Sequence, residues 1–368
     1  MQDLPGVSYV MPVLNEAGYV ESAVASILAQ DYPGPTEIVL ALGPSTDGTD
    51  AIVARLQRDD PRIQSVANPD VDIPIGLNRA IRASKNPIIA RVDAHTELPK
   101  DYTRHAVTTL LDRGAANVGG IMAAVGRPGL QAAVARAYNS RLGLGGGAYH
   151  TADEPAGPAE SAYLGVMRAD ALAEIGYFDE SLRRGEDWEL NSRFRAAGHL
   201  VWLDPALQVS YWPRSTWKAL VQQFWATGVW RGELVRRLRL RNSPRFFAPP
   251  VLVLATGATL ALTPLAVAAG GGALAWAAGV AAFGPAAYLA LLGGVAVFGG
   301  GPPADRLRYG GVLAVMHYAW GAGFLVGITR GARDAVDTSR TPVASSPSAS
   351  SPSASSPSAS SPSASSPS

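Results

Sequence analysis

The sequence has no cysteine among its 368 residues. It therefore cannot build a disulfide framework or a cysteine-ligated zinc or iron–sulfur site. It also lacks an excess of charge of either sign, because the formal net charge is +1, and this balance argues against a nucleic-acid binder. No basic start followed by an apolar run opens the chain, so we expect no cleaved signal peptide and a first domain on the cytoplasmic side.

Charge is missing altogether from one long stretch of the chain. Residues 248–299 contain no Lys, Arg, Asp or Glu, and a helix of about 20 apolar residues is long enough to cross a bilayer. The region 248–330 therefore predicts about three transmembrane helices, at residues 249–269, 273–298 and 310–329. Soluble core helices are the alternative, but runs this long without charge rarely have another use.

The C-terminal tail lacks large hydrophobic side chains. From residue 344 onward it contains only Ala, Ser and Pro, so it cannot build a core and residues 331–368 are expected to be disordered. Three crossings would leave this tail outside the cell. The basic link Asp305–Arg308 fits a cytoplasmic loop, but Arg330 and Arg333 favour a cytoplasmic C-terminus, so the sequence leaves the number of crossings open.

Residues 1–245 mix charged and apolar residues as a soluble domain does, and strands and helices alternate in the first domain, predicted at residues 1–215. Short runs rich in β-formers at 7–13, 37–42, 63–67 and 88–92 are separated by stretches with helical periodicity at about 19–29, 51–58 and 75–84. This alternation predicts a parallel α/β sheet with helices on both faces. Ligands bind such sheets beyond the carboxyl ends of the strands.

Polar side chains follow three of these strands where each strand ends. They are Asn15 and Glu16 after the first strand, Ser45–Asp47 after the second, and Asp93 and His95 after the fourth. A carboxylate and an imidazole two residues apart at a strand end suit Mg²⁺ or Mn²⁺ that also binds phosphate oxygens. The alternative for Asp93 and for Asp47 is an ordinary turn or helix-capping residue.

Two acidic residues precede a helix near residue 190. Glu186 or Asp187 could accept a proton from a substrate hydroxyl as a general base. Equally, Asp187 could cap the helix, because acidic residues favour helix N-termini. The glycine-rich residues 140–160 are expected to form a mobile loop over the site.

Residues 216–247 are predicted to form amphipathic helices at the membrane interface. Tryptophan and aliphatic side chains recur at helical spacing from Trp217 to Trp230, and six arginines follow between residues 231 and 245. Tryptophan beside an arginine cluster, just before an apolar run, is typical of a cytoplasmic membrane surface.

Taken together, several segments resemble a known family, the family 2 inverting glycosyltransferases with the GT-A fold, and within it the succinoglycan-biosynthesis-type membrane enzymes. The resemblance covers roughly residues 6–235. The segments that carry it are Pro12–Glu16, Ser45–Thr49, Gly76–Ala80, Ala90–His95, Asn117–Gly120, Gly176–Glu180 and Gly185–Arg193.

The resemblance implies roles for particular residues of this sequence. Asp187, with Glu186 beside it, matches the catalytic base, and Asp93 and His95 match the motif that holds Mg²⁺ or Mn²⁺ at the donor diphosphate. The residues implied in substrate binding are Pro12, Asn15, Glu16, Asp47, Asn78, Arg91, Asp93, Gln223, Trp230 and Arg231.

The implied partners are a nucleotide-sugar donor, a glycan or lipid-linked acceptor and membrane lipids, with no nucleic acid. The implied setting is exopolysaccharide, cell-surface polysaccharide or glycolipid synthesis at the inner (plasma) membrane, by a multi-pass protein with a cytoplasmic catalytic domain.

The sequence departs from the family pattern at two places. Ala41–Pro44 contains no carboxylate where relatives carry one that contacts the base, so the nucleotide is left open. The Gln-x-x-Arg-Trp motif of processive relatives is also absent near Gln223 and Trp230. Two other interpretations remain, a nucleotidyltransferase and a non-catalytic membrane scaffold. Pro12–Gly18 lacks the basic residues that the first would need, and the retained Asp93, His95 and Asp187 oppose the second.

Overall fold

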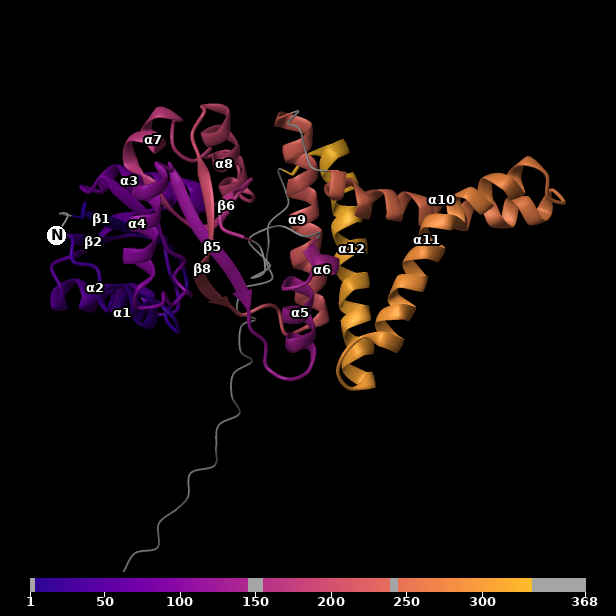
Figure 1. Cartoon of the computed structure of the whole chain (residues 1–368), viewed down its shortest axis with the longest axis horizontal. Coiled ribbons are helices and arrows are strands. Elements are labelled where there is room, and N and C mark those ends of the chain that lie inside the picture. The colour runs from indigo at the N-terminus through magenta and orange to yellow at the C-terminus, as the bar shows by residue number, and fades with distance from the viewer. Residues whose placement is uncertain (1–3, 145–154, 239–243, 333–368) are drawn as a thin grey trace, which may run out of the picture.

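The computed structural model describes residues 4–144, 155–238 and 244–332. Strands and helices alternate through the first two thirds of the chain, and long helices make up the rest (Figure 1). The strands are β1 (Val7–Val13), β2 (Thr36–Leu42), β3 (Ile63–Ala67), β4 (Ile88–Arg91), β5 (Asn117–Ala124), β6 (Gly157–Pro158), β7 (Tyr163–Arg168) and β8 (Val201–Tyr211).

The helices divide into a group around the sheet and a group after it. The helices of the first group are α1 (Val20–Leu28), α2 (Thr49–Asp59), α3 (Ile73–Ala83), α4 (Tyr102–Arg113), α5 (Leu130–Tyr138), α6 (Arg141–Leu144), α7 (Ala169–Glu174) and α8 (Glu186–Ala196). The second group comprises α9 (Trp217–Leu238), the 3₁₀ helix η2 (Pro244–Phe247), α10 (Ala248–Ala268), α11 (Ala273–Phe298) and α12 (Pro303–Arg330).

The strands form one sheet of eight in the order β3-β2-β1-β4-β7-β5-β8-β6. The predicted α/β class is confirmed, and the four predicted strands, β1 to β4, are parallel as expected, but the sheet as a whole is mixed. β7 runs antiparallel to both β4 and β5, and β6 antiparallel to β8. Being antiparallel, β7 starts at the end of the sheet where β5 finishes, whereas a parallel neighbour needs a crossover that brings the chain back to the end where β5 starts.

Helices cover both faces of the sheet, as alternation along β1 shows. Tyr9 and Met11 belong to a buried cluster shared with α1 and α4, whereas Val10, between them, belongs to a second cluster shared with α3, α7 and α8. Successive side chains of a strand point to opposite faces. The sheet is therefore buried on both sides, and open polar positions are left mainly at its edges and strand ends.

Helices α9 and α12 run parallel to each other in close contact. Trp217 lies against Gly311 near the start of the pair, and Glu233 lies against Gly331 near its end. Four glycines make the approach possible, because a Cβ at any of them would lie under 3.0 Å from backbone atoms of the other helix: Gly228, Gly232, Gly323 and Gly327.

Replacing one of these glycines should separate the two helices. Gly327→Ala places a methyl group on the backbone at Val229, and we expect it to cost about 1–3 kcal/mol of unfolding free energy. Gly310→Ala is the matched control on α12, since no atom lies within 4 Å of that Cβ position. Thermal unfolding in detergent micelles is the measurement; equal unfolding temperatures for the two variants would contradict the close packing.

Three of the described helices, α10, α11 and α12, are long and apolar enough to cross a membrane. On α10 and α11 large side chains such as Val267, Trp276 and Phe298 are 77–86% exposed, which in water would be strongly unfavourable. These helices lie where the sequence predicts apolar spans. The predicted disordered tail and mobile loop fall largely on residues 333–368 and 145–154, which lie outside the described residues.

Candidate active site

The loops that follow β1 and β2 are tied together by hydrogen bonds. The Asn15 side-chain oxygen accepts a hydrogen bond from the Thr46 amide at 2.8 Å, and the Ser45 hydroxyl accepts one from the Asn15 amide at 3.1 Å. Asn15 itself adopts a left-handed backbone conformation, φ 54°, which asparagine tolerates better than most residues. Pro12, Asn15 and Glu16 line a cavity at this edge of the sheet.

Asp47 and Asn78 do not line that cavity. The Asp47 carboxylate accepts hydrogen bonds from the amides of Ala17 and Thr49, which joins the loop after β1 to the first residue of α2. Asn78 is buried and exchanges hydrogen bonds with the Phe178 backbone. Both side chains are thus engaged in contacts within the domain, and their predicted substrate contacts stay a prediction.

The predicted metal-binding residues stand directly after β4. Asp93 and His95 both line the cavity, and His95 Nδ1 lies 3.3 Å from Glu16 Oε1. No group of three or more His, Asp or Glu side chains in the described part of the chain could hold a metal ion. A divalent cation with one or two protein ligands, completed by diphosphate oxygens, fits this donor set.

Arg91 joins the strand end to the start of α8. Its guanidinium is 6% exposed and binds three carboxylates: Glu186 at 3.1 Å, Asp93 at 3.3 Å, and Asp187. The role implied by sequence was substrate binding. Although Arg91 also lines the cavity, its donors mainly hold the proposed base beside the proposed metal ligand, which is a positioning role.

Electrostatic interactions in this cluster shift two pKa values. Burial disfavours the charged form of Arg91, but Asp187, Asp93 and Glu186 outweigh it and hold the pKa of Arg91 well above its ordinary value. Burial raises the pKa of Asp187, Arg91 lowers it, and Glu186 and Asp93 raise it again, which leaves it at about 7. Asp187 is therefore poised to gain or lose a proton near neutral pH.

Asp187 does not cap its helix. Gly185, in a left-handed conformation at φ 76°, is the residue that precedes α8, and no side chain forms a capping hydrogen bond there. The Asp187 side chain instead binds Arg91 and remains 37% exposed. The sequence left helix capping and proton transfer open as roles for Asp187. This geometry does not support capping, and it leaves the carboxylate available for chemistry.

Helix α9 fixes the first turn of α8 through Arg231. The Arg231 guanidinium lies 4.5 Å from the Trp188 ring and 4.4 Å from the Phe246 ring, in cation–π geometry on two sides. Trp230 is buried in the cluster that contains Trp188. Trp230 and Arg231 line the cavity, where substrate binding by them stays a prediction, and both pack near Trp188, the residue next to Asp187.

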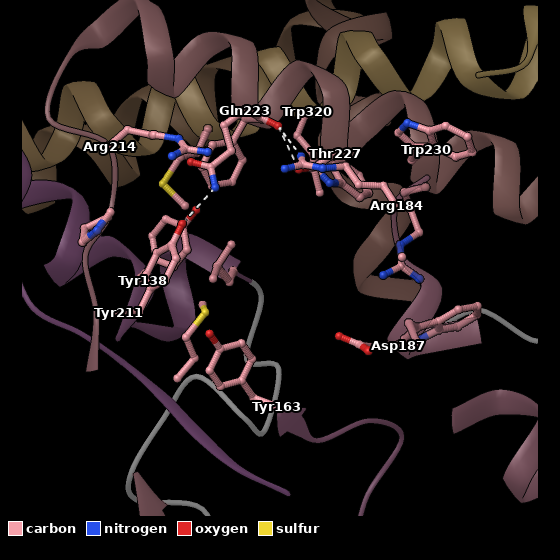
Figure 2. A pocket seen from close by; sticks show the side chains of 18 of the residues that line it. Tyr138, Tyr163, Arg184, Asp187, Tyr211, Arg214, Gln223, Thr227, Trp230 and Trp320 are labelled. Carbon is pink, nitrogen blue, oxygen red and sulfur yellow. Dashed lines mark hydrogen bonds between the residues drawn. The ribbon is translucent and has the colours of Figure 1, made fainter. Parts of the chain in front are cut away.

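The cavity has a volume of about 2540 Å³ and extends from the strand ends to the apolar helices. Figure 2 shows Asp187 on one side of its open space and Tyr138, Tyr211, Arg214 and Gln223 on the other. The Tyr138 and Tyr211 rings stack at 5.5 Å, and Gln223 donates to the Tyr211 hydroxyl at 3.1 Å.

Sequence reasoning missed several residues that line this cavity. Arg184 donates to the Thr227 hydroxyl at 2.7 Å and so connects α8's preceding loop to α9. After β3, Asp70 and Asp72 also line the cavity and pair with Arg79 and Arg183. Asp70 and Asp72 form an acidic pair just after a predicted strand, which is a local signal, whereas no local pattern marks Arg184.

The mixed sheet, with helices on both faces, has the GT-A fold. A solved structure, mannosyltransferase PcManGT from Pyrobaculum calidifontis in complex with GDP-Man and Mn²⁺, has this fold. It is similar with a TM-score of 0.54 and 22% identity, over 89% of this chain and 88% of that one.

The chain belongs to glycosyltransferase family 2. The model of that family matches residues 8–176. The succinoglycan biosynthesis protein ExoA of Rhizobium meliloti is 34% identical over 86% of this chain and 92% of its own length. A dolichyl-phosphate-sugar glucuronosyltransferase of Methanococcus voltae is 24% identical over 63% of this chain and 74% of its own length. Family membership confirms the predicted enzyme class over the nucleotidyltransferase and the scaffold.

Proposed function

We propose that this glycosyltransferase moves a sugar, with inversion, from a nucleotide-sugar donor to a membrane-associated glycan or lipid-linked acceptor. The observation that carries the proposal is the Arg91 cluster, which holds Asp187 next to Asp93 in a cavity that reaches the apolar helices. The similarity to a succinoglycan biosynthesis protein supports a role in making an exopolysaccharide or another cell-surface glycan.

In this mechanism Asp187 accepts the proton of the acceptor hydroxyl. The freed oxygen attacks the anomeric carbon of the donor sugar from the face opposite the diphosphate. The bond from that carbon to the nucleoside diphosphate breaks, and the diphosphate leaves with the bonding electrons. A pKa near 7 suits the proton acceptor, because at neutral pH much of the carboxyl is ionised and still basic.

Asp93 and His95 are the residues that would hold Mg²⁺ or Mn²⁺ against the donor diphosphate. Such an ion supplies charge neutralisation to the leaving group as a Lewis acid. Pro12, Asn15 and Glu16 border the same end of the cavity, where we place the nucleotide. The Mn²⁺ named with the Pyrobaculum structure supports a divalent ion in this fold.

The charge pattern of the cavity supports an acceptor that comes from the membrane side. Its acidic side chains, among them Asp93 and Asp187, gather near the strand ends. Basic side chains, among them Arg184, Arg214 and Lys218, line the part next to α9. The lining that comes from α10, α11 and α12 is mostly apolar, with Tyr288 and His317 as its polar members. A cavity with acidic, basic and apolar parts suits an acceptor that has a sugar, an anionic group and a hydrocarbon chain.

We place the protein in the inner (plasma) membrane, with the sheet domain in the cytoplasm. The apolar helices support the membrane. The basic side chains Arg236 and Arg237 on α9, next to these helices, support the cytoplasmic orientation, because Lys and Arg accumulate on that side. Residues 1–215, 216–247, 248–330 and 331–368 remain the proposed domain boundaries.

The proposed function is tested by screening sugar nucleotides. Purified protein in detergent is incubated with Mn²⁺ and single donors with uridine, guanosine or thymidine bases, and released nucleoside diphosphate is measured with and without a membrane-lipid extract. We expect one donor class to be consumed and the extract to increase its consumption. Release from no donor under any of these conditions would contradict the proposal.

The rate should depend on the ionisation of Asp187. Since only the ionised carboxylate accepts a proton, we expect activity to fall about tenfold per pH unit below an apparent pKa near 7 and to level off above it. The measurement is kcat/KM for the acceptor between pH 5 and 9, with donor binding followed in parallel. A rate that stays flat down to pH 5 would contradict the assignment of Asp187 as the base.

A further inference from the structure

Helix α12 contacts the catalytic domain near its start and at its middle. Near its start, the Arg136 guanidinium of α5 lies 4.3 Å from the Tyr309 ring and donates to the Gly300 carbonyl at 2.9 Å. At its middle, His317 Nε2 lies 3.2 Å from the Gly143 carbonyl oxygen of α6. Two separate elements of the domain therefore lie against the first half of this helix.

The end of α12 also lies against the catalytic domain. Ala332, just after the helix, is 1% exposed and belongs to the buried cluster that contains Leu182 and Trp188, the neighbour of Asp187. The domain thus follows α12 from one end to the other. Figure 1 shows the same arrangement, with α9 and α12 side by side between the sheet and the α10–α11 pair.

Helix α9 accompanies α12 over this whole distance. Their contact runs from Gly311 to Gly331, a length of about 30 Å at 1.5 Å per residue, which equals the thickness of the hydrocarbon core. α9 is not a membrane-crossing helix by composition, because five of its residues are charged: Lys218, Arg231, Glu233, Arg236 and Arg237.

A crossing α12 would draw these groups into hydrocarbon. Glu233 is fully buried and is held by Arg236 and Arg237, and α9, α5 and α6 would all lie at membrane depth beside it. Charged side chains and the irregular backbone of a soluble domain are strongly unfavourable there. Composition makes α12 a candidate span, but its neighbours do not fit that position.

Helices α10 and α11 have the opposite surroundings. Their large apolar side chains are mostly exposed, among them Leu260, Trp276 and Phe283 at 73–80%. α10 begins beside α12, where Pro249 lies against Gly321, and α11 ends at Phe298, five residues before α12 begins. Both outer ends of this pair are therefore at α12, and its connecting turn, residues 269–272, lies away from the domain (Figure 1).

From these contacts we infer that only α10 and α11 cross the bilayer, and that α12 lies flat in the lipid headgroup region as a partner of α9. Its apolar side chains face α9, the cavity and the acyl boundary. Its cationic ends, Arg306, Arg308 and Arg330, are then level with the anionic headgroups. The C-terminus lies on the same side as the catalytic domain, which accounts for the arginines that three crossings leave unexplained.

The absence of cysteine makes a labelling test clean, since every introduced thiol is unique. We would prepare Arg58→Cys in the exposed part of α2, Gly271→Cys in the α10–α11 turn, and Ser368→Cys at the C-terminus. Full-length protein in right-side-out vesicles is treated with a membrane-impermeant maleimide, before and after permeabilisation, and the labelled fraction is measured. No activity is needed, so the result is independent of the proposed function.

We expect Arg58→Cys and Ser368→Cys to react only after permeabilisation, and Gly271→Cys to react in intact vesicles. Ser368→Cys on the opposite side from Arg58→Cys would overturn the inference. If both reacted in intact vesicles while Gly271→Cys did not, α12 would still not cross, but the cytoplasmic orientation proposed above would be wrong. The two proposals therefore fail separately.

Depth measurements separate a flat α12 from a crossing one directly. Nitroxide labels at Leu307, Ala314 and Thr329 of α12 are compared with labels at Val280, Leu289 and Val297 of α11 in lipid nanodiscs. The depth of each label follows from comparing how strongly dissolved oxygen and a water-soluble nickel complex accelerate its spin relaxation. We expect one shallow depth along α12 and a depth that passes through the bilayer centre along α11. A matching deep profile along α12 would overturn the inference.

Discussion

Asp187→Asn is expected to lower turnover by about 100-fold or more. Asparagine keeps the shape of the side chain but cannot accept the proton of the acceptor hydroxyl. Donor binding should stay close to that of the unaltered protein, because the nucleotide end of the cavity is formed by the loops after β1 and β4. The measurement pairs the initial transfer rate with donor affinity from isothermal titration.

The control for this experiment is Asp170→Asn on α7. Asp170 forms an exposed ion pair with Arg168, and it does not line the cavity. We expect it to leave the rate unchanged. A loss of less than about tenfold in Asp187→Asn, with Asp170→Asn unaffected, would show that Asp187 acts only as a structural partner of Arg91.

Asp93→Ala is expected to reduce transfer by about 100-fold or more and to remove the metal dependence of donor binding. The carboxylate is the stronger of the two proposed protein ligands, and His95 alone would leave the ion with neutral protein ligation. Donor affinity is measured with Mn²⁺ and with a chelator, for Asp93→Ala and for Asp101→Ala, an exposed residue outside the cavity.

The outcome that counts against the metal assignment is specific. If Asp93→Ala transferred sugar at nearly the unaltered rate in excess chelator, neither Asp93 nor a divalent ion would be needed. A variant that lost activity but kept Mn²⁺-dependent donor binding would limit Asp93 to holding Arg91, which it contacts at 3.3 Å.

Much of the fold could be predicted from local sequence, because its signals are local. The run Val7–Val13 is short, rich in β-formers and followed by polar residues, and the structure has β1 there with Asn15 and Glu16 at its end. β7 was not predicted, and its antiparallel direction depends on which end of the sheet the returning chain enters. That choice is made by tertiary packing and leaves no periodic signal.

The sequence was enough to identify several residues of the site, but not the contacts that each of them makes. Asp93 and Asp187 are 94 positions apart, and nothing local indicates that one arginine binds both. Family motifs likewise do not show where a side chain points, and the hydrogen bond from the Asn78 amide to the Phe178 backbone could not be read from them. The Tyr138 and Tyr211 rings stack only because the fold brings the end of α5 beside the end of β8.

The membrane region illustrates the limit of composition. An apolar helix face that packs against α9 or lines a cavity has the same composition as one that faces lipid. Length and hydropathy therefore class α12 with α10 and α11 as candidate spans. Only its contacts, such as those of Tyr309 and His317 with α5 and α6, distinguish it.

The α10–α11 pair has a consequence for the fate of the product. Two helices packed against each other enclose no space, and a hydrated glycan can pass through hydrocarbon only inside a ring of protein that hides it from the acyl chains. One copy of the described chain, with the inferred topology, therefore has no conduit through the bilayer. If the acceptor is the lipid-linked glycan proposed above, the product stays on the face where it is made, and its export would require a second protein that carries it across the bilayer.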